Sequence, residues 1–187
     1  MREIEKGWGH SLKLDDPELA NRVQRVDYDF GDRLIDATVD VDRSGQYRGC
    51  RQFLDYYTCT ADSWNRVTQL ALNFGAGTIR RCIWAHPIKD SKLLISFPDV
   101  PSSDAIVGYY GIAGSGKASR QAPAEMSVAV NGIIVATFNS EQKGELATFE
   151  IPLKNSNKSH EVTFEISAKD VSQRHFCFNA QGVGLAD

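Results

Sequence analysis

The strongest constraint on the fold is a period-two alternation of apolar and polar side chains. Residues 26–30 and 35–42 alternate apolar side chains with Asp and Thr, and residues 162–166 alternate them with Thr and Glu. Successive side chains of a β-strand point to opposite faces of the sheet. The alternation therefore predicts strands with one buried face and one solvated face.

A hairpin signal reinforces this prediction. Asn131-Gly132 separates the apolar runs 126–130 and 133–138. Asn-Gly is the dipeptide that best fits a two-residue type I′ turn, which needs positive φ at both positions. Five further runs predict strands: 79–85, 92–97, 105–112, 146–153 and 174–181.

Helical signals are few. Asp16-Pro17-Glu18-Leu19 predicts a short helical turn with Asp as N-cap, and residues 62–74 are the one segment that could form a longer helix. About nine or ten strands without βαβ alternation predict an all-β fold, an antiparallel β-sandwich with one or two short helices. We expect residues 1–22 to be an N-terminal extension and residues 23–187 to form a single domain.

Charge and hydropathy exclude several partners. The 187 residues include 21 Lys and Arg against 24 Asp and Glu, a net charge of −3. This balance argues against nucleic acid, does not favour an anionic membrane, and favours a ligand that is not a polyanion. No apolar run is long enough to insert into a bilayer. Residues 1–6 lack the apolar stretch of a signal peptide, so for an exported domain we expect the signal outside this segment.

The four cysteines suggest disulfides rather than a metal site. The closest two, Cys50 and Cys59, are separated by eight residues, which does not fit the short spacing of zinc ligands. We favour the pairs Cys50–Cys59 and Cys82–Cys177, which places the domain outside the cell, in a periplasm or in the cell envelope. The alternative is four reduced cysteines in a cytosolic protein.

One segment approaches a nucleotide-binding motif. Residues 111–118, Gly-Ile-Ala-Gly-Ser-Gly-Lys-Ala, differ from a P-loop at Ala118, which lacks the hydroxyl that holds Mg²⁺. The following residues end at Pro123 and are too short for the helix that a P-loop must open. We therefore expect a Gly/Ser loop and no bound nucleotide.

Acidic residues gather near the start of the domain. Asp29 and Asp32, on either side of Gly31, could supply oxygen ligands to a structural Ca²⁺. The alternative is that these carboxylates belong to a solvated strand face. The four histidines form no His-x-His or His-Glu-x-x-His pair, so a zinc site has no sequence support.

Alternation also predicts a second, outward face on the central strands. In residues 174–179 it directs Phe176 and Phe178 to the core and the intervening side chains outward. If Cys82 bonds Cys177, the strand 79–85 contributes to the same outward face. That face then carries Arg80, Trp84, His86, His175 and Asn179.

An outward Trp among hydrogen-bonding groups suits a sugar ring. Tyr109 is a further candidate, because alternation exposes one ring of each of the pairs Tyr56-Tyr57 and Tyr109-Tyr110; Trp64 offers another aromatic ring. We expect replacement of Trp84 by Ala to leave stability nearly unchanged. The alternative is that Trp84 belongs to the core and Arg81 faces solvent, which would spare Arg81 an inward position that needs a partner.

The layout resembles the galactose-binding-like jelly-roll sandwich of carbohydrate-binding modules. The resemblance covers roughly residues 22–185 and rests on the acidic opening strands, the hairpin at 126–135, the strands 146–153 and 160–166, and the Phe-rich closing strand. It implies carbohydrate binding on loops or a concave face, often beside a structural Ca²⁺. It carries over no individual binding residue.

Three functions are therefore weighed. The first is a non-catalytic carbohydrate-binding domain, an accessory part of a larger exported protein. The second is a structural or protein-interaction sandwich without a small ligand. The third is a jelly-roll glycan hydrolase or lyase, which needs two carboxylates or a Tyr/His pair in one cleft, and no spacing selects such a pair.

Overall fold

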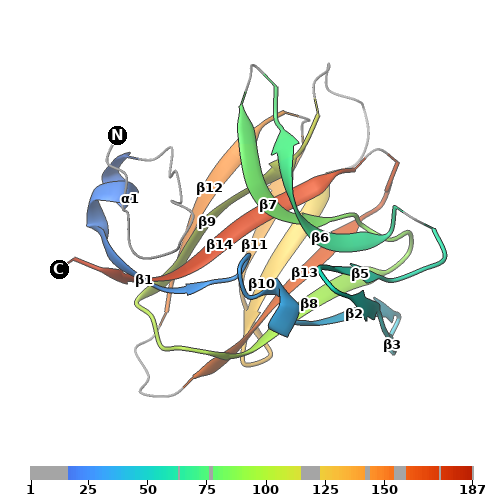
Figure 1. Ribbon diagram of the computed structural model, residues 1–187, viewed down its shortest axis with the longest axis horizontal. Helices are drawn as coiled ribbons and strands as arrows, with labels where there is room; N and C mark the ends of the chain where they lie inside the picture. Colours follow the sequence, from blue (N-terminus) through green and yellow to red (C-terminus); the bar gives the residue numbers. More distant parts are fainter. Residues whose placement is uncertain are drawn as a thin grey trace.

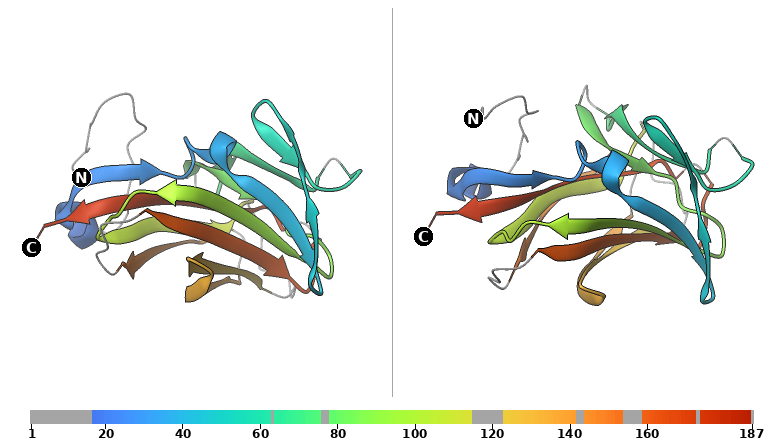
Figure 2. Two further views of the ribbon diagram at one scale, coloured as in Figure 1. Left: turned by 90° about the horizontal axis from the view of Figure 1, so that it is seen from below. Right: turned by 60° about the horizontal axis from the view of Figure 1, so that its bottom comes forward.

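The computed structural model describes residues 17–62, 64–75, 78–114, 123–141, 144–153, 159–172 and 174–186. In these ranges the chain forms two antiparallel sheets that stack face to face, as Figures 1 and 2 show. The predicted all-β sandwich is confirmed. No helix among the described residues is long and apolar enough to cross a membrane.

The larger sheet has eight strands. They are β1 (Val23–Asp29), β4 (Arg51–Phe53), β5 (Tyr56–Thr58), β6 (Arg66–Asn73), β7 (Ile79–Ala85), β9 (Ala105–Ile112), β12 (Leu146–Pro152) and β14 (Phe176–Leu185). Their order is β12-β9-β14-β7-β6-β5-β4, and β1 also pairs with β14.

The smaller sheet has six strands. They are β2 (Thr38–Arg43), β3 (Gln46–Gly49), β8 (Lys92–Val100), β10 (Ala124–Val130), β11 (Ile133–Ser140) and β13 (His160–Ala168). Their order is β11-β10-β13-β8-β2-β3. The predicted hairpin between β10 and β11 is confirmed, since Asn131 and Gly132 have φ values of 51° and 78°.

Aromatic side chains fill the space between the sheets. Phe30 lies 5.0 Å from Phe97 and 5.1 Å from Phe164, ring centre to ring centre, and Phe164 lies 4.6 Å from Phe178. All four are fully buried, and each contributes roughly 1.5–3 kcal/mol through burial. Phe176 and Phe178 both belong to this core, as the alternation predicts.

Two secondary-structure predictions need correction. The predicted helix at 62–74 is wrong, because residues 66–73 form β6, paired to β5 and β7. Intrinsic helix propensity contributes little free energy, and the backbone hydrogen bonds that the segment forms with a strand on each side outweigh it. The predicted strand at 35–42 begins only at Thr38, after a 3₁₀ turn at Leu34–Asp36.

The start of the domain and the strand count also differ from expectation. The short predicted helix is present as α1 (Pro17–Arg22), whereas the expected N-cap Asp16 lies outside the described residues. Fourteen strands are described instead of nine or ten. The additional strands include β3, β4 and β5, which are only three or four residues long and too short for a periodic signal.

Candidate functional site

Both predicted disulfides are present. Cys50 bonds Cys59 with a Cα–Cα distance of 4.2 Å, and Cys82 bonds Cys177 with a Cα–Cα distance of 5.8 Å. In the ladder between β14 and β7, Cys177 lies directly opposite Trp84. Trp84 therefore shares the outer face of the eight-stranded sheet with the disulfide, on the side away from the Phe core.

Strand register arranges this outer face in two parallel rows. Phe53 of β4, Tyr56 of β5, Thr68 of β6 and Trp84 of β7 lie opposite one another from strand to strand; we call the three rings among them the aromatic row. Two residues away along each strand, a second row on the same face holds Arg51, Thr58 and Arg66. His86, just after the end of β7, and His175, just before the start of β14, continue this second row. We call the four basic residues of this set the basic row.

Each member of the basic row packs on a ring of the aromatic row. The Arg51 guanidinium lies 4.8 Å from the centre of the Phe53 ring, and the Arg66 guanidinium 4.9 Å from that of Tyr56. Cation–π packing of this kind favours one orientation of each guanidinium. His175 makes a ring–ring contact instead, with its ring 5.8 Å from that of Trp84.

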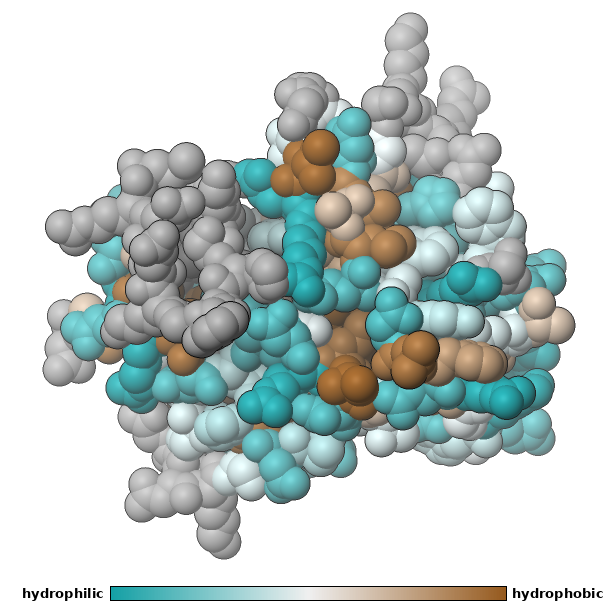
Figure 3. Space-filling view, viewed as in Figure 1, coloured by the Kyte–Doolittle hydropathy of each residue, from teal (hydrophilic) through white to brown (hydrophobic). Residues whose placement is uncertain are grey.

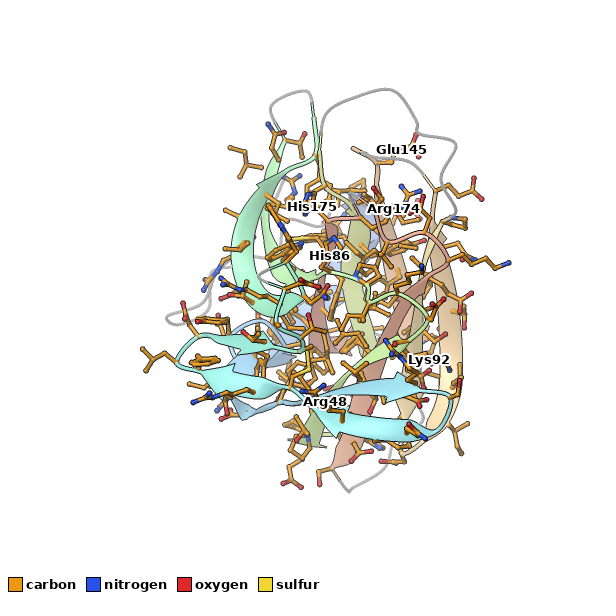
Figure 4. All side chains as sticks on the ribbon, turned by 90° about the vertical axis from the view of Figure 1, so that its right-hand side faces the viewer. Arg48, His86, Lys92, Glu145, Arg174 and His175 are labelled. Carbon is orange, nitrogen blue, oxygen red and sulfur yellow. A yellow bond between two sulfur atoms is a disulfide. The ribbon has the colours of Figure 1, made fainter. Side chains whose placement is uncertain are left out.

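At the end of the rows, four rings form a cluster. His86 lies 5.7 Å from His175 and 6.2 Å from Trp84, between ring centres, and Figure 4 shows the two histidines at one end of the sandwich. The fourth ring is Trp64, from the turn between β5 and β6, 6.1 Å from His175. We call Trp64, Trp84, His86 and His175 the ring cluster.

Exposure within the ring cluster differs from the sequence-based expectation. Trp84 faces outward, as the disulfide argument requires, but it is only 8% exposed, so the expectation of an open stacking ring there is wrong. Trp64 is 62% exposed and is the open ring of the cluster. A large aromatic side chain inside a polar turn, residues 60–65, was the available sequence signal for Trp64.

Buried polar atoms without partners lie on this face. Trp84 Nε1, Arg66 Nε and Asn179 Oδ1 are inaccessible to solvent and form no hydrogen bond with any residue that the structure describes. Buried polar groups are nearly always hydrogen-bonded, and each exception calls for an explanation. Two of the three atoms belong to the ring cluster or the adjacent basic row.

The His86 imidazole is held by the backbone. Its Nδ1 lies 2.9 Å from the Pro87 carbonyl oxygen. Burial lowers the pKa of His86, the hydrogen bond to Pro87 opposes this effect, and the nearby His175 adds to it. A neutral ring that donates from Nδ1 leaves Nε2 as a hydrogen-bond acceptor.

The structure separates the other predicted ligand residues from the ring cluster. Arg80 and Asn179 lie on the same face but away from the ring cluster. Arg80 is four residues before Trp84 in β7, and Asn179 is four residues after His175, in β14. Tyr109 is buried against Cys82 and Cys177 and donates its hydroxyl hydrogen to the Arg81 carbonyl. The expectation that one ring of the 109–110 pair is exposed is wrong, because β9 is a central strand covered on both faces.

Arg81 is exposed, as the alternative for Trp84 expects, although its strand position is inward. It lies on the inward side of β7 by alternation but is exposed, donates a hydrogen bond to Gln69 and lies 3.9 Å from Asp32. The Arg81 guanidinium therefore has partners in Gln69 and Asp32. An inward strand position for Arg81 is compatible with an outward Trp84.

The predicted calcium ligands are engaged by protein groups. Asp29 Oδ1 accepts hydrogen bonds from the backbone N–H of Gly31 (2.9 Å) and of Asp32 (3.1 Å), and Oδ2 accepts one from Gln181. Within the described ranges, no group of three or more His, Cys, Asp and Glu side chains could hold a metal ion. The calcium site stays a prediction.

The surface on this side of the molecule is mixed rather than apolar. In Figure 3 hydrophobic side chains form separate patches among hydrophilic ones. The P-loop-like segment contributes nothing that can be described, because residues 115–122 lie outside the described ranges.

Comparison with known proteins identifies the fold. No protein-family model matches the chain, and no curated protein sequence matches it. Among solved structures, the tandem CBM51 modules of the family 98 glycoside hydrolase from Streptococcus pneumoniae SP3-BS71 superpose with a TM-score of 0.51 at 10% identity. That alignment covers 72% of this chain and 45% of the pneumococcal one.

Two structures from Clostridium perfringens are also similar. The CBM51-2 and INT domains of ZmpB give a TM-score of 0.47 at 14% identity, covering 81% of this chain and 37% of that one. The CBM51 of GH95 in complex with methyl-galactose gives 0.43 at 10% identity, covering 73% and 95%. These two scores add nothing to the argument, whereas the pneumococcal match and the two stacked antiparallel sheets show that the chain shares the β-sandwich fold of the pneumococcal CBM51 modules.

Proposed function

We propose that this domain binds carbohydrate without catalysis, as an accessory part of a larger exported protein. The ring cluster on the outer face of the eight-stranded sheet carries the proposal. The fold of carbohydrate-binding modules supports it. The two disulfides support export, because such bonds persist in oxidising compartments.

Trp64 is the group that would stack on the sugar. Its exposed indole can cover the apolar C–H face of a pyranose, and such amphipathic contacts need polar groups nearby for the hydroxyls. His175 lies beside it and would be the polar group that meets a sugar hydroxyl. Trp84 Nε1 is inaccessible to solvent, so we assign it no contact with the sugar.

One observation favours the second function, a protein-interaction sandwich without a small ligand. Trp84, the ring expected to stack, is almost completely covered. An interaction surface would use Trp64 as a hot-spot residue instead. The experiment below separates the two functions, because a sugar competes only in the first.

The test is a glycan array followed by calorimetric titration of the glycans that bind. Trp64→Ala is expected to abolish binding with little change in melting temperature, because its side chain is largely exposed. Tyr47→Ala is the matched control, since Tyr47 is 69% exposed on the six-stranded sheet. Full binding by Trp64→Ala, or no glycan bound by the wild-type domain, would contradict the proposal.

A further inference from the structure

The basic row makes the outer face of the eight-stranded sheet positively charged, whereas the whole chain has a net negative charge. The outward positions of β4, β5, β6 and β7, all within the described part of the chain, hold three arginines and no carboxylate. They are Arg51, Phe53, Tyr56, Thr58, Arg66, Thr68, Leu70, Leu72, Arg80, Cys82 and Trp84. His86 and His175 extend the same face. The net charge of −3 is therefore unevenly distributed.

Two of these arginines are oriented by aromatic rings instead of by carboxylates. Arg51 packs over Phe53 and Arg66 over Tyr56, and the two rings stack on each other at 5.2 Å with planes 15° apart. Neither Arg51 nor Arg66 forms an ion pair with a described carboxylate. A surface arginine usually finds such a partner when one is near, so this arrangement leaves both cations uncompensated.

A guanidinium above a ring keeps its hydrogen-bonding capacity. The attraction to the ring acts on the positive charge, and the five N–H donors of a guanidinium lie in its own plane, so those directed away from the ring stay available to a ligand. A fork of this kind matches the two oxygens of a carboxylate or a sulfate. Arg66 Nε is buried and without a partner, so one donor of the fork is already desolvated.

The cations lie next to the proposed sugar platform. Arg66 follows Trp64 by two residues, and its backbone N–H bonds the Trp64 carbonyl at 2.9 Å. Across the ladder, the His86 N–H lies 3.5 Å from the Arg66 carbonyl, which brings the ring cluster alongside. Arg51 is two strands from Arg66 in the same row, about 10 Å at the usual strand spacing.

The geometry points to an acidic glycan as the ligand, one whose sugars carry a carboxylate or a sulfate ester. This inference rests on the proposed function and names its ligand class. Trp64 would stack on a sugar ring while Arg66 binds its anionic group, and Arg51 would meet a second anionic group further along the same saccharide. A neutral sugar would leave both cations unpaired.

The experiment compares matched glycans that differ only in charge. Neutral, uronate-containing and sulfate-ester forms of the glycans found on the array are titrated against the intact domain at low and high NaCl concentration. We expect the acidic form to bind at least about tenfold more tightly than the neutral form, because a charge-assisted hydrogen bond is worth about 1.5–3 kcal/mol. The difference should shrink as salt rises.

Two variants locate the effect. Arg66→Gln and Arg51→Gln should each remove most of the preference for the acidic form, measured as the ratio of its affinity to that of the neutral form. Arg48→Gln is the matched control, because Arg48 is an exposed arginine on the six-stranded sheet. The uronate and sulfate forms are titrated separately, so the preferred anion is read directly.

The outcomes separate the two proposals. Equal affinity for neutral and acidic forms, or a preference that survives in both variants, overturns the acidic-glycan inference while carbohydrate binding stands. Absence of binding to every glycan overturns the proposed function and this inference together. Because Arg51 is exposed, Arg51→Gln remains informative if Arg66→Gln does not fold.

Discussion

Cys177 of β14 lies directly opposite Trp84 of β7, and this one pairing defines the outer face of the larger sheet. The neighbouring bond between Cys82 and Cys177 fixes two central strands to each other. All the rings and cations of the candidate site are placed relative to that pairing.

Trp84→Ala is expected to destabilise the domain strongly. The ring is 8% exposed and contacts two histidines, and truncation of a buried Trp costs about 3–5 kcal/mol. For a domain of this size, each kcal/mol lowers the melting temperature by about 2–4 °C. Thermal unfolding followed by circular dichroism checks this, with Trp64→Ala as the exposed control. Equal melting temperatures for the two variants would argue that the Trp84 ring is open in solution.

Stability is expected to fall as the medium becomes acidic, in part through His86. The folded state lowers the pKa of this imidazole, chiefly through burial, so below the ordinary value of 6.5 the unfolded chain binds the proton more readily. The contribution of His86 is therefore present above pH 6.5 and is lost as pH falls through the lower folded-state pKa. Melting temperatures from pH 8 to pH 5 should decline less steeply in His86→Gln. An identical slope in both proteins would show that His86 is not the group responsible.

Arg174→Met is expected to stabilise the domain. Arg174, labelled in Figure 4, is fully buried, its three guanidinium nitrogens have no hydrogen-bond partner in the described part of the chain, and burial lowers its pKa, an effect that nearby Asp170 partly opposes. Replacing a poorly compensated buried charge with an apolar side chain of similar size is often stabilising, by about 1–4 kcal/mol. Chemical denaturation measures the change. A loss of stability would instead reveal a partner for the guanidinium in solution.

Asp29→Ala is expected to destabilise the turn after β1 by about 1–3 kcal/mol. The substitution removes the acceptor for two backbone N–H groups and for Gln181. Asp29→Asn is the control, since it keeps one acceptor oxygen for the turn.

The same variants test the calcium prediction. If Asp29 and Asp32 hold a structural Ca²⁺, EDTA lowers the melting temperature of the wild-type domain and Ca²⁺ restores it, while Asp29→Ala no longer responds. An unchanged wild-type melting temperature in EDTA would leave Asp29 with a purely hydrogen-bonding role.

Local sequence was a good guide wherever local chemistry decides the structure. The alternation over 162–166 and the turn at Asn131-Gly132 both predict what is present, because side-chain period and positive φ are properties of a few adjacent residues. The failure at residues 66–73 has the opposite origin. Residues 66–73 pair with the neighbouring strands β5 and β7, and these hydrogen bonds lie outside the segment whose own pattern suggested a helix.

For the candidate site too, some features were predictable from sequence and others only from the tertiary structure. Sequence alone determined the sandwich class, because alternation is a local property, whereas it only favoured the two disulfide pairs and left the core position of Trp84 open as an alternative. Tertiary structure alone decided that Trp64 lies beside His175 and that Arg66 of β6 packs over Tyr56 of β5. The physical reason is that strand register, and not spacing along the chain, sets which side chains meet across a sheet.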